Sequence, residues 1–272
     1  PPLNRELALD MMARTRVARA LDAFRGAAPV DLDALIRVLL RLSDLACELP
    51  AVQELDINPL LADHDGVIAL DARIRVAADA PLAPDLRYSH LAIHPYPRHL
   101  ERALALKDGA TVRLRPIRPE DGQAEARFIS RLTPQTLYLR FHVPVKELTR
   151  DRLVRFTQID YDREMAFVAI DTDADPEEIR AIARYTRSPE GGSCEFGLTV
   201  EDRWQRRGLG QALLAALETH ARCMGVQHIY GWVLSDNAVM RQLLQTRGYQ
   251  KERGEQGAGH VLRFGRSLSE GM

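Results

Sequence analysis

The sequence predicts an α/β chain in two parts: a larger C-terminal part with a mixed sheet and helices on its faces, and a smaller α+β part before it. Three observations carry this prediction. Strand and helix patterns alternate as β-α-β-α-β-β toward the end of the chain, which is typical of helices packed on a sheet. The first 80 residues instead run helix, helix, strand, strand. Prolines crowd the stretch from residue 81 to residue 97, which separates the two patterns.

The composition excludes several classes of protein. Of the 272 residues 46% are hydrophobic and 28% are charged, which excludes a disordered or low-complexity chain. The formal net charge of -1 argues against a nucleic-acid partner. No apolar run reaches the roughly 18–20 residues that a membrane span needs, so no membrane partner is expected. Three scattered cysteines suit neither a disulfide framework nor a thiolate metal site, so a reducing, cytoplasmic setting is expected.

Two helices are predicted first. Asn4 and Asp31 are suited to cap them, because a side-chain oxygen at that place can accept the unpaired N–H groups of a first turn. The first helix is expected to bury a face that includes Leu7 and Met11. The second carries leucine and isoleucine at helical spacing over residues 32–45. Because the chain opens with two prolines and no methionine, it is interpreted as a C-terminal fragment of a longer protein.

Two strands and a linker follow. The strands are predicted at residues 52–57 and 67–70, with turn-forming residues at 63–66 between them. Prolines then interrupt any periodicity, so residues 81–108 are predicted as a linker. The predicted domains are therefore residues 1–80 and residues 109–268.

The second predicted domain begins with a strand, three helices and three strands, and continues with helix, strand, helix and two strands. The strands are expected at residues 111–115, 165–171, 179–187, 194–201, 228–234, near 249 and at 261–265, and the helices at 119–131, 133–140, 149–157, 208–224 and 237–247. In the helix at 208–224, Leu209, Leu213 and Leu217 recur on one side, so this helix should pack an apolar stripe on the sheet.

The most informative motif is the loop Gln205-Arg206-Arg207-Gly208-Leu209-Gly210, between a predicted strand and this helix. A helix N-terminus presents unpaired N–H groups and a partial positive charge, which bind phosphate oxygens. The two glycines let the backbone approach those oxygens because no Cβ intrudes, and the two arginines add positive charge. A glycine pair before a helix also occurs in simple turns, but the flanking strand, the amphipathic helix and the arginines favour phosphate binding.

With this loop, residues 110–266 resemble the GNAT acetyltransferases. The resemblance implies a mostly antiparallel, twisted sheet, acetyl-CoA as co-substrate, and a pyrophosphate site formed by the loop and Gln211. In that family the strand before the loop is splayed from its neighbour and binds pantetheine through main-chain groups, which here implies Leu198 and Val200. An asparagine at the start of the next helix lies beside CoA in the family, and Asn237 matches it.

Glu195, on the strand before the loop, is the candidate general base. An amine acceptor is mostly protonated near neutral pH, so its attack on a thioester needs a base. The position resembles that of the glutamate assigned as general base in the GNAT domains of bacterial protein lysine acetyltransferases. We expect Glu195 to be buried beside Phe196. The alternative is a solvated strand glutamate without a role. No general acid is assigned, because Tyr249 comes too late to match the family's tyrosine and is expected to be a core aromatic.

Residues 52–60 and 67–73 resemble the end of an ATP-grasp domain, as in succinyl-CoA synthetase β-subunits and ADP-forming acyl-CoA synthetases. The resemblance implies that Asn58 and Asp71 correspond to positions that hold the Mg²⁺ of ATP. The alternative is a turn asparagine and an ordinary strand-end aspartate. Nucleotide binding in that fold needs a preceding subdomain with its lysines, and the first 80 residues contain no lysine. We therefore expect this fragment to hold neither a metal nor ATP.

An acyl-CoA synthetase-like region before a GNAT domain resembles the bacterial protein lysine acetyltransferases that act on acyl-CoA synthetases. The leading hypothesis is therefore direct acetyl transfer, in a ternary complex, from acetyl-CoA to a protein lysine, with an acyl-CoA synthetase as the protein partner. Three alternatives stay open: a small-molecule amine acetyltransferase, a non-catalytic acetyl-CoA-sensing module, and a truncated acyl-CoA synthetase.

Overall fold

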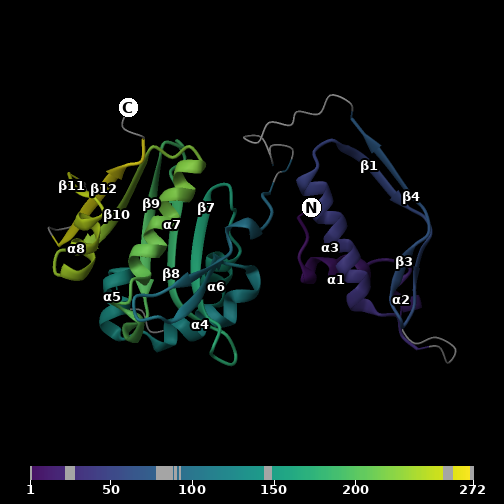
Figure 1. Ribbon diagram of the computed structural model, residues 1–272, viewed down its shortest axis with the longest axis horizontal. Coiled ribbons are helices and arrows are strands. Elements are labelled where there is room, and N and C mark those ends of the chain that lie inside the picture. The colour runs from purple at the N-terminus through teal and green to yellow at the C-terminus, as the bar shows by residue number, and fades with distance from the viewer. Residues whose placement is uncertain are drawn as a thin grey trace. The chain divides into compact units, whose positions relative to one another are not determined.

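Two compact units make up the chain, Pro1–Pro95 and Tyr96–Met272, hereafter the first and the second unit (Figure 1). The structure is a computed structural model that describes residues 2–21, 28–77, 88, 91, 93–143, 149–253 and 260–269. The division between the units falls inside the predicted linker, of which Pro81 and Pro84 lie outside the described residues.

The helices of the first unit are α1 (Arg5–Ala13), α2 (Ala18–Leu21) and α3 (Leu32–Glu48). Both predicted caps are confirmed. The side chain of Asn4 accepts the backbone N–H of Leu7 at 2.8 Å, and the side chain of Asp31 accepts that of Ala34, also at 2.8 Å. Each cap supplies an acceptor for a backbone N–H group of the first turn that has no acceptor within the helix.

The predicted apolar face of the first helix is wrong. Ala8 and Met12 are buried, whereas Leu7 and Met11 are exposed. The reason is that α1 ends at Ala13 and packs on α3 through Ala8, Met12 and Ile36, which form the core of this unit. A short helix that docks on one neighbour buries the stripe that faces that neighbour, and two overlapping apolar stripes in the sequence do not show which one it will be.

The first unit contains four short strands among its described residues rather than the predicted two. They are β1 (Val52–Ile57), β2 (Leu60–Ala62), β3 (Val67–Ala69) and β4 (Ala72–Val76). The predicted turn at residues 63–66 joins β2 to β3, and β1 pairs antiparallel with β4. Strands of three to six residues leave too little alternation to be recognised singly.

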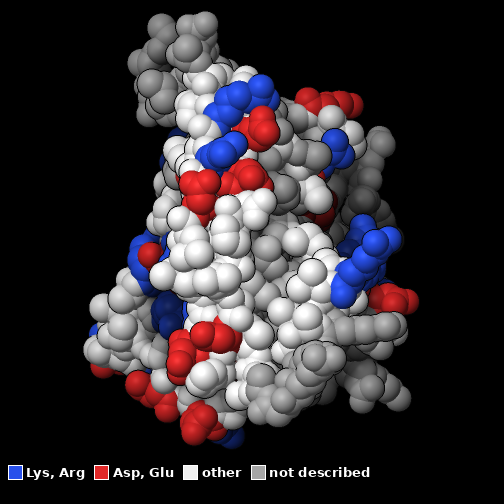
Figure 2. Space-filling view, turned by 90° about the vertical axis from the view of Figure 1, so that its right-hand side faces the viewer, with Lys and Arg blue, Asp and Glu red and all other residues white. Residues whose placement is uncertain are grey.

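Much of the apolar surface of these strands is exposed. Ile68, Leu70, Ile74 and Val76 are each more than half exposed. Figure 2 shows a face of the molecule whose middle carries few charged side chains (Figure 2). The first unit therefore buries a small core and leaves a large share of its apolar side chains in contact with water.

An eight-stranded sheet forms the centre of the second unit, in the order β11-β12-β10-β9-β8-β7-β6-β5. Its strands are β5 (Arg102–Ala105), β6 (Thr111–Pro116), β7 (Glu164–Asp171), β8 (Glu178–Arg187), β9 (Ser193–Val200), β10 (His228–Leu234), β11 (Gln250–Glu252) and β12 (Val261–Ser267). Neighbouring strands are antiparallel except β9 and β10, which run parallel. The predicted fold class, a mixed and mostly antiparallel sheet flanked by helices, is confirmed.

Helices cover both faces of this sheet. They are α4 (Gly122–Arg131), α5 (Pro134–Phe141), α6 (Arg150–Thr157), α7 (Leu209–Cys223) and α8 (Ala238–Thr246). The predicted stripe of α7 is confirmed, because Leu213 and Leu217 are fully buried in the larger core, and Figure 1 shows this helix lying along β7 to β9. Phe128 and Ile129 of α4 enter a second core on the opposite face. None of the helices among the described residues combines the length and apolar composition of a membrane span.

Strand β5 was not predicted. It lies within residues 81–108, the predicted linker, and pairs antiparallel with β6 from Arg102↔Leu114 to Ala105↔Thr111. Four residues between prolines and a polar turn carry no recognisable alternation, so the strand becomes visible only through its partner. The end of the predicted linker is thus the edge of the sheet.

Candidate active site

The site begins where β9 and β10 separate. These strands pair only from Ser193↔His228 to Glu195↔Tyr230, and beyond Glu195 no further pairs form between them. Glu201 donates its N–H to the carbonyl of Arg180 on β8 at 2.9 Å, in register with the antiparallel ladder of β8 and β9. Because main-chain groups point to alternate sides along a strand, those of Leu198 and Val200 face away from β8, toward the opening. Both predicted pantetheine positions therefore face the opening, although the carbonyl of Val200 already accepts a hydrogen bond from Gln205 Nε2 at 3.2 Å.

The loop after β9 has the backbone of an anion-binding turn. Gly208 has φ +99° and Arg206 has φ +62°, so two residues near the start of α7 are left-handed. Glycine adopts this conformation without cost, whereas arginine rarely does, and such strain gathers at binding sites. Left-handed residues among successive N–H groups form concavities that bind anions, and here they lead directly into a helix N-terminus.

Strand opening and loop together border a cleft of about 580 Å³. Most of the predicted cofactor positions line it: Leu198, Val200, Gln205, Arg206, Gly208, Gly210, Gln211 and Asn237. Two predicted positions do not. The side chain of Leu209 is buried in the core, and that of Arg207 turns away to pair with Asp108 and to stack on Trp204, with its Cζ 4.1 Å from the ring centre.

Asn237 begins α8 at the far wall of the cleft. Its Oδ1 accepts the N–H of Met240 at 3.1 Å, which caps the helix and leaves the amide nitrogen of the same side chain for a ligand. Beside it, Val239, Met240 and Leu243 make this wall apolar. The asparagine thus has a structural role in addition to the binding role that the sequence predicted.

Sequence reasoning missed Lys107, in the turn between β5 and β6. Its N–H donates to the carbonyl of Arg207 at 3.2 Å, its side chain lines the cleft, and its Cγ lies 3.5 Å from where a Cβ on Gly208 would be. The turn is therefore fixed to the phosphate-binding loop and brings an ammonium group to it. The one available signal was that Lys107 is among only three lysines in the chain.

Glu195 lies at the last pair before β9 and β10 part, and its side chain is exposed. The expected burial beside Phe196 is wrong, because successive strand residues point to opposite faces. Phe196 faces α7 and contacts Tyr249 edge-on, with 5.5 Å between ring centres, whereas Glu195 faces the other way. The carboxylate is thus open to an acceptor that approaches from solvent.

Tyr249 is confirmed as a core aromatic. It is 3% exposed, and its hydroxyl donates to Glu218 at 3.2 Å. Burial, followed by the charge of Glu218, raises the pKa of this hydroxyl well above its usual range. Tyr249 is therefore occupied in the core, and no general acid is assigned.

The two positions predicted from the ATP-grasp resemblance are neighbours in the first unit. The N–H of Asn58 donates to the carbonyl of Asp71 at 3.1 Å, beside the paired ends of β1 and β4. Both side chains are exposed. The Asp71 carboxylate lies 3.9 Å from Arg73 Nε.

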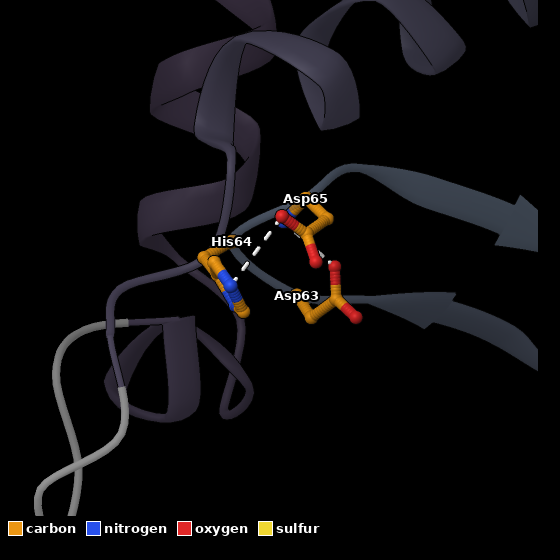
Figure 3. A group of neighbouring side chains, drawn as sticks. All are labelled: Asp63, His64 and Asp65. Atoms are coloured by element: carbon orange, nitrogen blue, oxygen red, sulfur yellow. Dashed lines mark hydrogen bonds and ion pairs between the residues drawn. The ribbon is translucent and has the colours of Figure 1, made fainter.

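The described residues contain a group of metal-ligating side chains at the turn between β2 and β3. Ligand atoms of Asp63, His64 and Asp65 lie within 4.8 Å of one another, and all three residues are exposed (Figure 3). The Asp63 carboxylate accepts the N–H groups of Asp65 at 2.9 Å and Gly66 at 3.1 Å. Turn formation therefore explains this group, as the sequence predicted for these residues.

Comparisons with known proteins agree with this geometry. Residues 134–249 match the acetyltransferase (GNAT) family, and residues 1–76 match an ATP-grasp domain. The chain is 37% identical over 150 residues to Acetyltransferase PA5475 of Pseudomonas aeruginosa, which covers 55% of this chain and 80% of that protein. The crystal structure of the GNAT domain of S. lividans PAT superimposes with a TM-score of 0.59 at 28% identity, covering 64% of this chain and 99% of that one.

The first unit has its own relative. Over 73 residues it is 40% identical to the ADP-forming acetate–CoA ligase I subunit beta of Pyrococcus furiosus, which covers 27% of this chain and 32% of the ligase subunit. The chain thus spans about a third of that relative.

The chain belongs to the GNAT acetyltransferase family. It is an acyltransferase enzyme, and acetyl-CoA is its co-substrate.

The residues present fit that co-substrate. A Cβ on Gly210 would make ordinary contacts, 3.4 Å from Leu243 and 3.5 Å from Leu198, so a side chain that extends beyond Cβ would have to displace one of these leucines of the cleft wall. A helix N-terminus, Arg206 and Lys107 would supply positive charge for the phosphates, and the main-chain groups of β9 that face the opening would supply amide partners for pantetheine.

Proposed function

We propose that this enzyme transfers the acetyl group of acetyl-CoA to the side-chain amine of a protein lysine, by direct attack in a ternary complex, with Glu195 as general base. The observation that carries the proposal is the placement of Glu195. Glu195 is exposed at the point where β9 leaves β10. It comes three residues before Leu198, whose main-chain groups face the cleft. A base at this place would be open to a large acceptor on the solvent side and would lie, along β9, beside the acyl end of acetyl-CoA bound in the cleft.

In the proposed reaction Glu195 takes a proton from the acceptor ammonium, directly or through one water. The neutral nitrogen forms a bond to the carbonyl carbon of the thioester, and the carbon–sulfur bond breaks as the amide forms. The sulfur leaves with the bonding pair as the CoA thiolate, which takes a proton from water. Holding the amine and the thioester side by side makes the attack effectively intramolecular, a large part of the rate advantage.

Two features support a protein acceptor, and specifically an acyl-CoA synthetase. The first unit is similar to part of an acetate–CoA ligase, so an acetyltransferase domain is fused to a region of the kind its acceptor would contain. The exposed position of Glu195 also suits a lysine carried on a folded protein rather than a small amine enclosed by the site. Three scattered cysteines suit a reducing compartment, so we also propose a cytoplasmic location.

Mass spectrometry tests the proposal. The chain is incubated with acetyl-CoA and a panel of acyl-CoA synthetases, and in parallel with polyamines and amino acids. We expect acetylated lysine on a synthetase, and none with Glu195→Gln at the same protein concentration. Acetylation of small amines alone would replace the proposed acceptor. Binding of acetyl-CoA without transfer to any acceptor would favour a sensing module.

A further inference from the structure

Arg140, near the end of α5, places its guanidinium directly against the backbone of β9. A Cβ on Gly197 would lie 2.5 Å from Arg140 Nη2 and 2.6 Å from its Cζ, so only glycine leaves room for this group. The side chain is half-buried, and it lines the acetyl-CoA cleft on one side and a small cavity containing Glu125 and Arg184 on the other. The guanidinium is therefore part of the cleft wall.

Within the described part of the chain, Arg140 has neither a hydrogen bond nor an ion pair. Arg115, Arg180 and Arg247, which are also little exposed, pair with Asp121, with Asp171 and Glu201, and with Glu218. The half-buried Arg127 and Arg241 also lack an ion pair among the described residues, but neither lines the cleft, whereas Arg140 does. Desolvation, with the nearby Arg184, lowers the pKa of Arg140 to about 10, so the group is still charged at neutral pH. Donors on a cleft wall that no acceptor of the protein uses are available to an oxygen of a bound ligand.

Charged groups of both signs surround Arg140. Glu125 is 3% exposed; its Oε1 lies 3.4 Å from Arg184 Nη2 and its Oε2 has no hydrogen-bond partner. Burial raises the pKa of Glu125 to about 7. Arg140 therefore lies within electrostatic reach of Arg184, of the partly ionised Glu125 and of the Glu195 carboxylate, but it forms an ion pair with neither carboxylate.

The order of residues along β9 indicates which part of a bound acetyl-CoA would lie beside Arg140. Leu198 turns its main-chain groups to the opening, and Glu195 is the proposed base. Gly197, against which the guanidinium of Arg140 lies, is between them on the strand. Residues of a strand advance about 3.3 Å each, so a thioester held between Leu198 and Glu195 lies beside Arg140. The phosphate-binding loop lies at the other end of the strand, so the cleft offers the guanidinium an acyl oxygen rather than a phosphate.

We infer that Arg140 is a further catalytic residue, which donates hydrogen bonds to the acetyl carbonyl oxygen as that oxygen gains negative charge. The inference rests on the proposed function, because it needs the thioester of acetyl-CoA beside Glu195. As the amine nitrogen bonds to the carbonyl carbon, the π pair moves to oxygen. Arg140 stabilises this oxyanion without losing its own proton, and the pair returns when the carbon–sulfur bond breaks. Donors fixed in advance at a developing charge are a major source of rate enhancement.

The direct test is infrared spectroscopy of bound acetyl-CoA labelled with ¹³C at the acetyl carbonyl. Hydrogen bonds from Arg140 should shift the carbonyl band of the wild-type complex to lower frequency than in solution. Arg140→Met should lose this shift while acetyl-CoA still binds with nearly unchanged Kd by calorimetry. With an acceptor, kcat should fall by about 10²–10³-fold, the usual loss when one oxyanion donor is removed.

Two further variants keep the test decisive should Arg140→Met fail to fold. Gly197→Ala retains the arginine but displaces its guanidinium, and Arg140→Lys retains the charge without the planar donors; both should lose most of the shift. Arg152→Met, an exposed arginine of α6, is the control and should keep both the band and the rate. An unchanged band in Arg140→Met with acetyl-CoA bound would overturn the inference, as would a raised acceptor KM with an unchanged band. If the wild type binds acetyl-CoA but transfers to no acceptor, the shift still decides the role of Arg140, and only the proposed acceptor fails.

Discussion

The two units of this chain differ in where they keep their charges. In the described part of the first unit, every ion-paired side chain is at least a third exposed, the least exposed being Asp31 at 33%. In the second unit, Arg115 and Asp121 are 7% and 9% exposed and meet through two bonds of 2.7 Å. Exposed pairs contribute about 0–1 kcal/mol, whereas breaking a buried pair costs about 3–5 kcal/mol.

The charged side chains of the first unit lie at its surface, whereas the second unit holds several charged side chains in fixed positions in its interior. Polar groups with little access to water are usually paired, so an arginine on a cleft wall without a partner is a candidate to bind a ligand. Arg140 is such a group in the second unit, whereas exposed arginines of the first unit, such as Arg73 or Arg75, lie in water and indicate no ligand. The predictions below test whether chemistry is confined to the second unit.

The largest effect is expected for Glu195→Gln. The substitution keeps the shape of the side chain and removes the base, so kcat should fall by roughly 10²–10⁴-fold. Acetyl-CoA affinity should be nearly unchanged, because this side chain is not among the cleft-lining residues. Steady-state kinetics and calorimetry measure the two quantities. Near-normal turnover would remove Glu195 from the mechanism, and loss of acetyl-CoA binding would give it a structural role instead.

Gly210→Ile should weaken acetyl-CoA binding. A β-branched side chain has to displace Leu243 or Leu198 and moves the first turn of α7 away from the phosphates. Lost charge-assisted hydrogen bonds should cost on the order of 2–3 kcal/mol in binding free energy. Calorimetry on the folded variant gives the answer. Gly122→Ile is the control, because Gly122 has an ordinary φ of -51°, has open space at its Cβ position and lies outside the cleft. Equal affinity in wild type and Gly210→Ile would place the phosphate site elsewhere.

Glu125→Gln should change how stability depends on pH. Because burial raises the folded-state pKa of Glu125 to about 7, the folded protein holds this proton more tightly than the unfolded chain does. The wild type should therefore lose about 2 kcal/mol of unfolding free energy from this group between pH 5 and pH 7. The variant cannot ionise there and should lack that decline.

The measurement is urea unfolding at pH 5, 6 and 7. His220 acts in the opposite sense, because burial lowers its pKa to about 4, so its contribution grows as the pH rises toward 6.5. Both proteins share His220, so the difference between them reports on Glu125 alone. Parallel pH dependences of the two proteins would show that Glu125 is ionised throughout this range.

The smallest effect, none, is expected for Mg·ATP at the first unit. Asn58 and Asp71 are exposed, and the first 80 residues offer no lysine for the phosphates. Equilibrium binding should show no affinity tighter than about 1 mM, which corresponds to roughly -4 kcal/mol. Asn58→Ala should change nothing. Tighter binding that Asn58→Ala abolishes would mean that this unit holds a nucleotide, and the contrast between the units would fail.

The sequence was most informative where local chemistry determines structure. The glycine-containing loop, the apolar stripe of α7 and the side-chain caps at Asn4 and Asp31 each follow from a few adjacent residues, and the structure has all of them. Positions that depend on distant partners were missed. Arg140 gains its meaning from Gly197, which lies far along the chain, and Lys107 from a strand too short to recognise. The orientation of Glu195 was wrong because its neighbour Phe196 took the buried face.

The edge strand β5 has a practical consequence for anyone who separates the acetyltransferase domain. A version that starts at residue 109, where the sequence pattern begins, would lack β5 and leave the N–H and C=O groups of β6 without partners. Bare sheet edges of this kind promote pairing between molecules, so that version should aggregate on expression. It would also lack Lys107, and a low affinity for acetyl-CoA could then be mistaken for a property of the enzyme. Starting at Tyr96 keeps the strand, the turn and the cleft together.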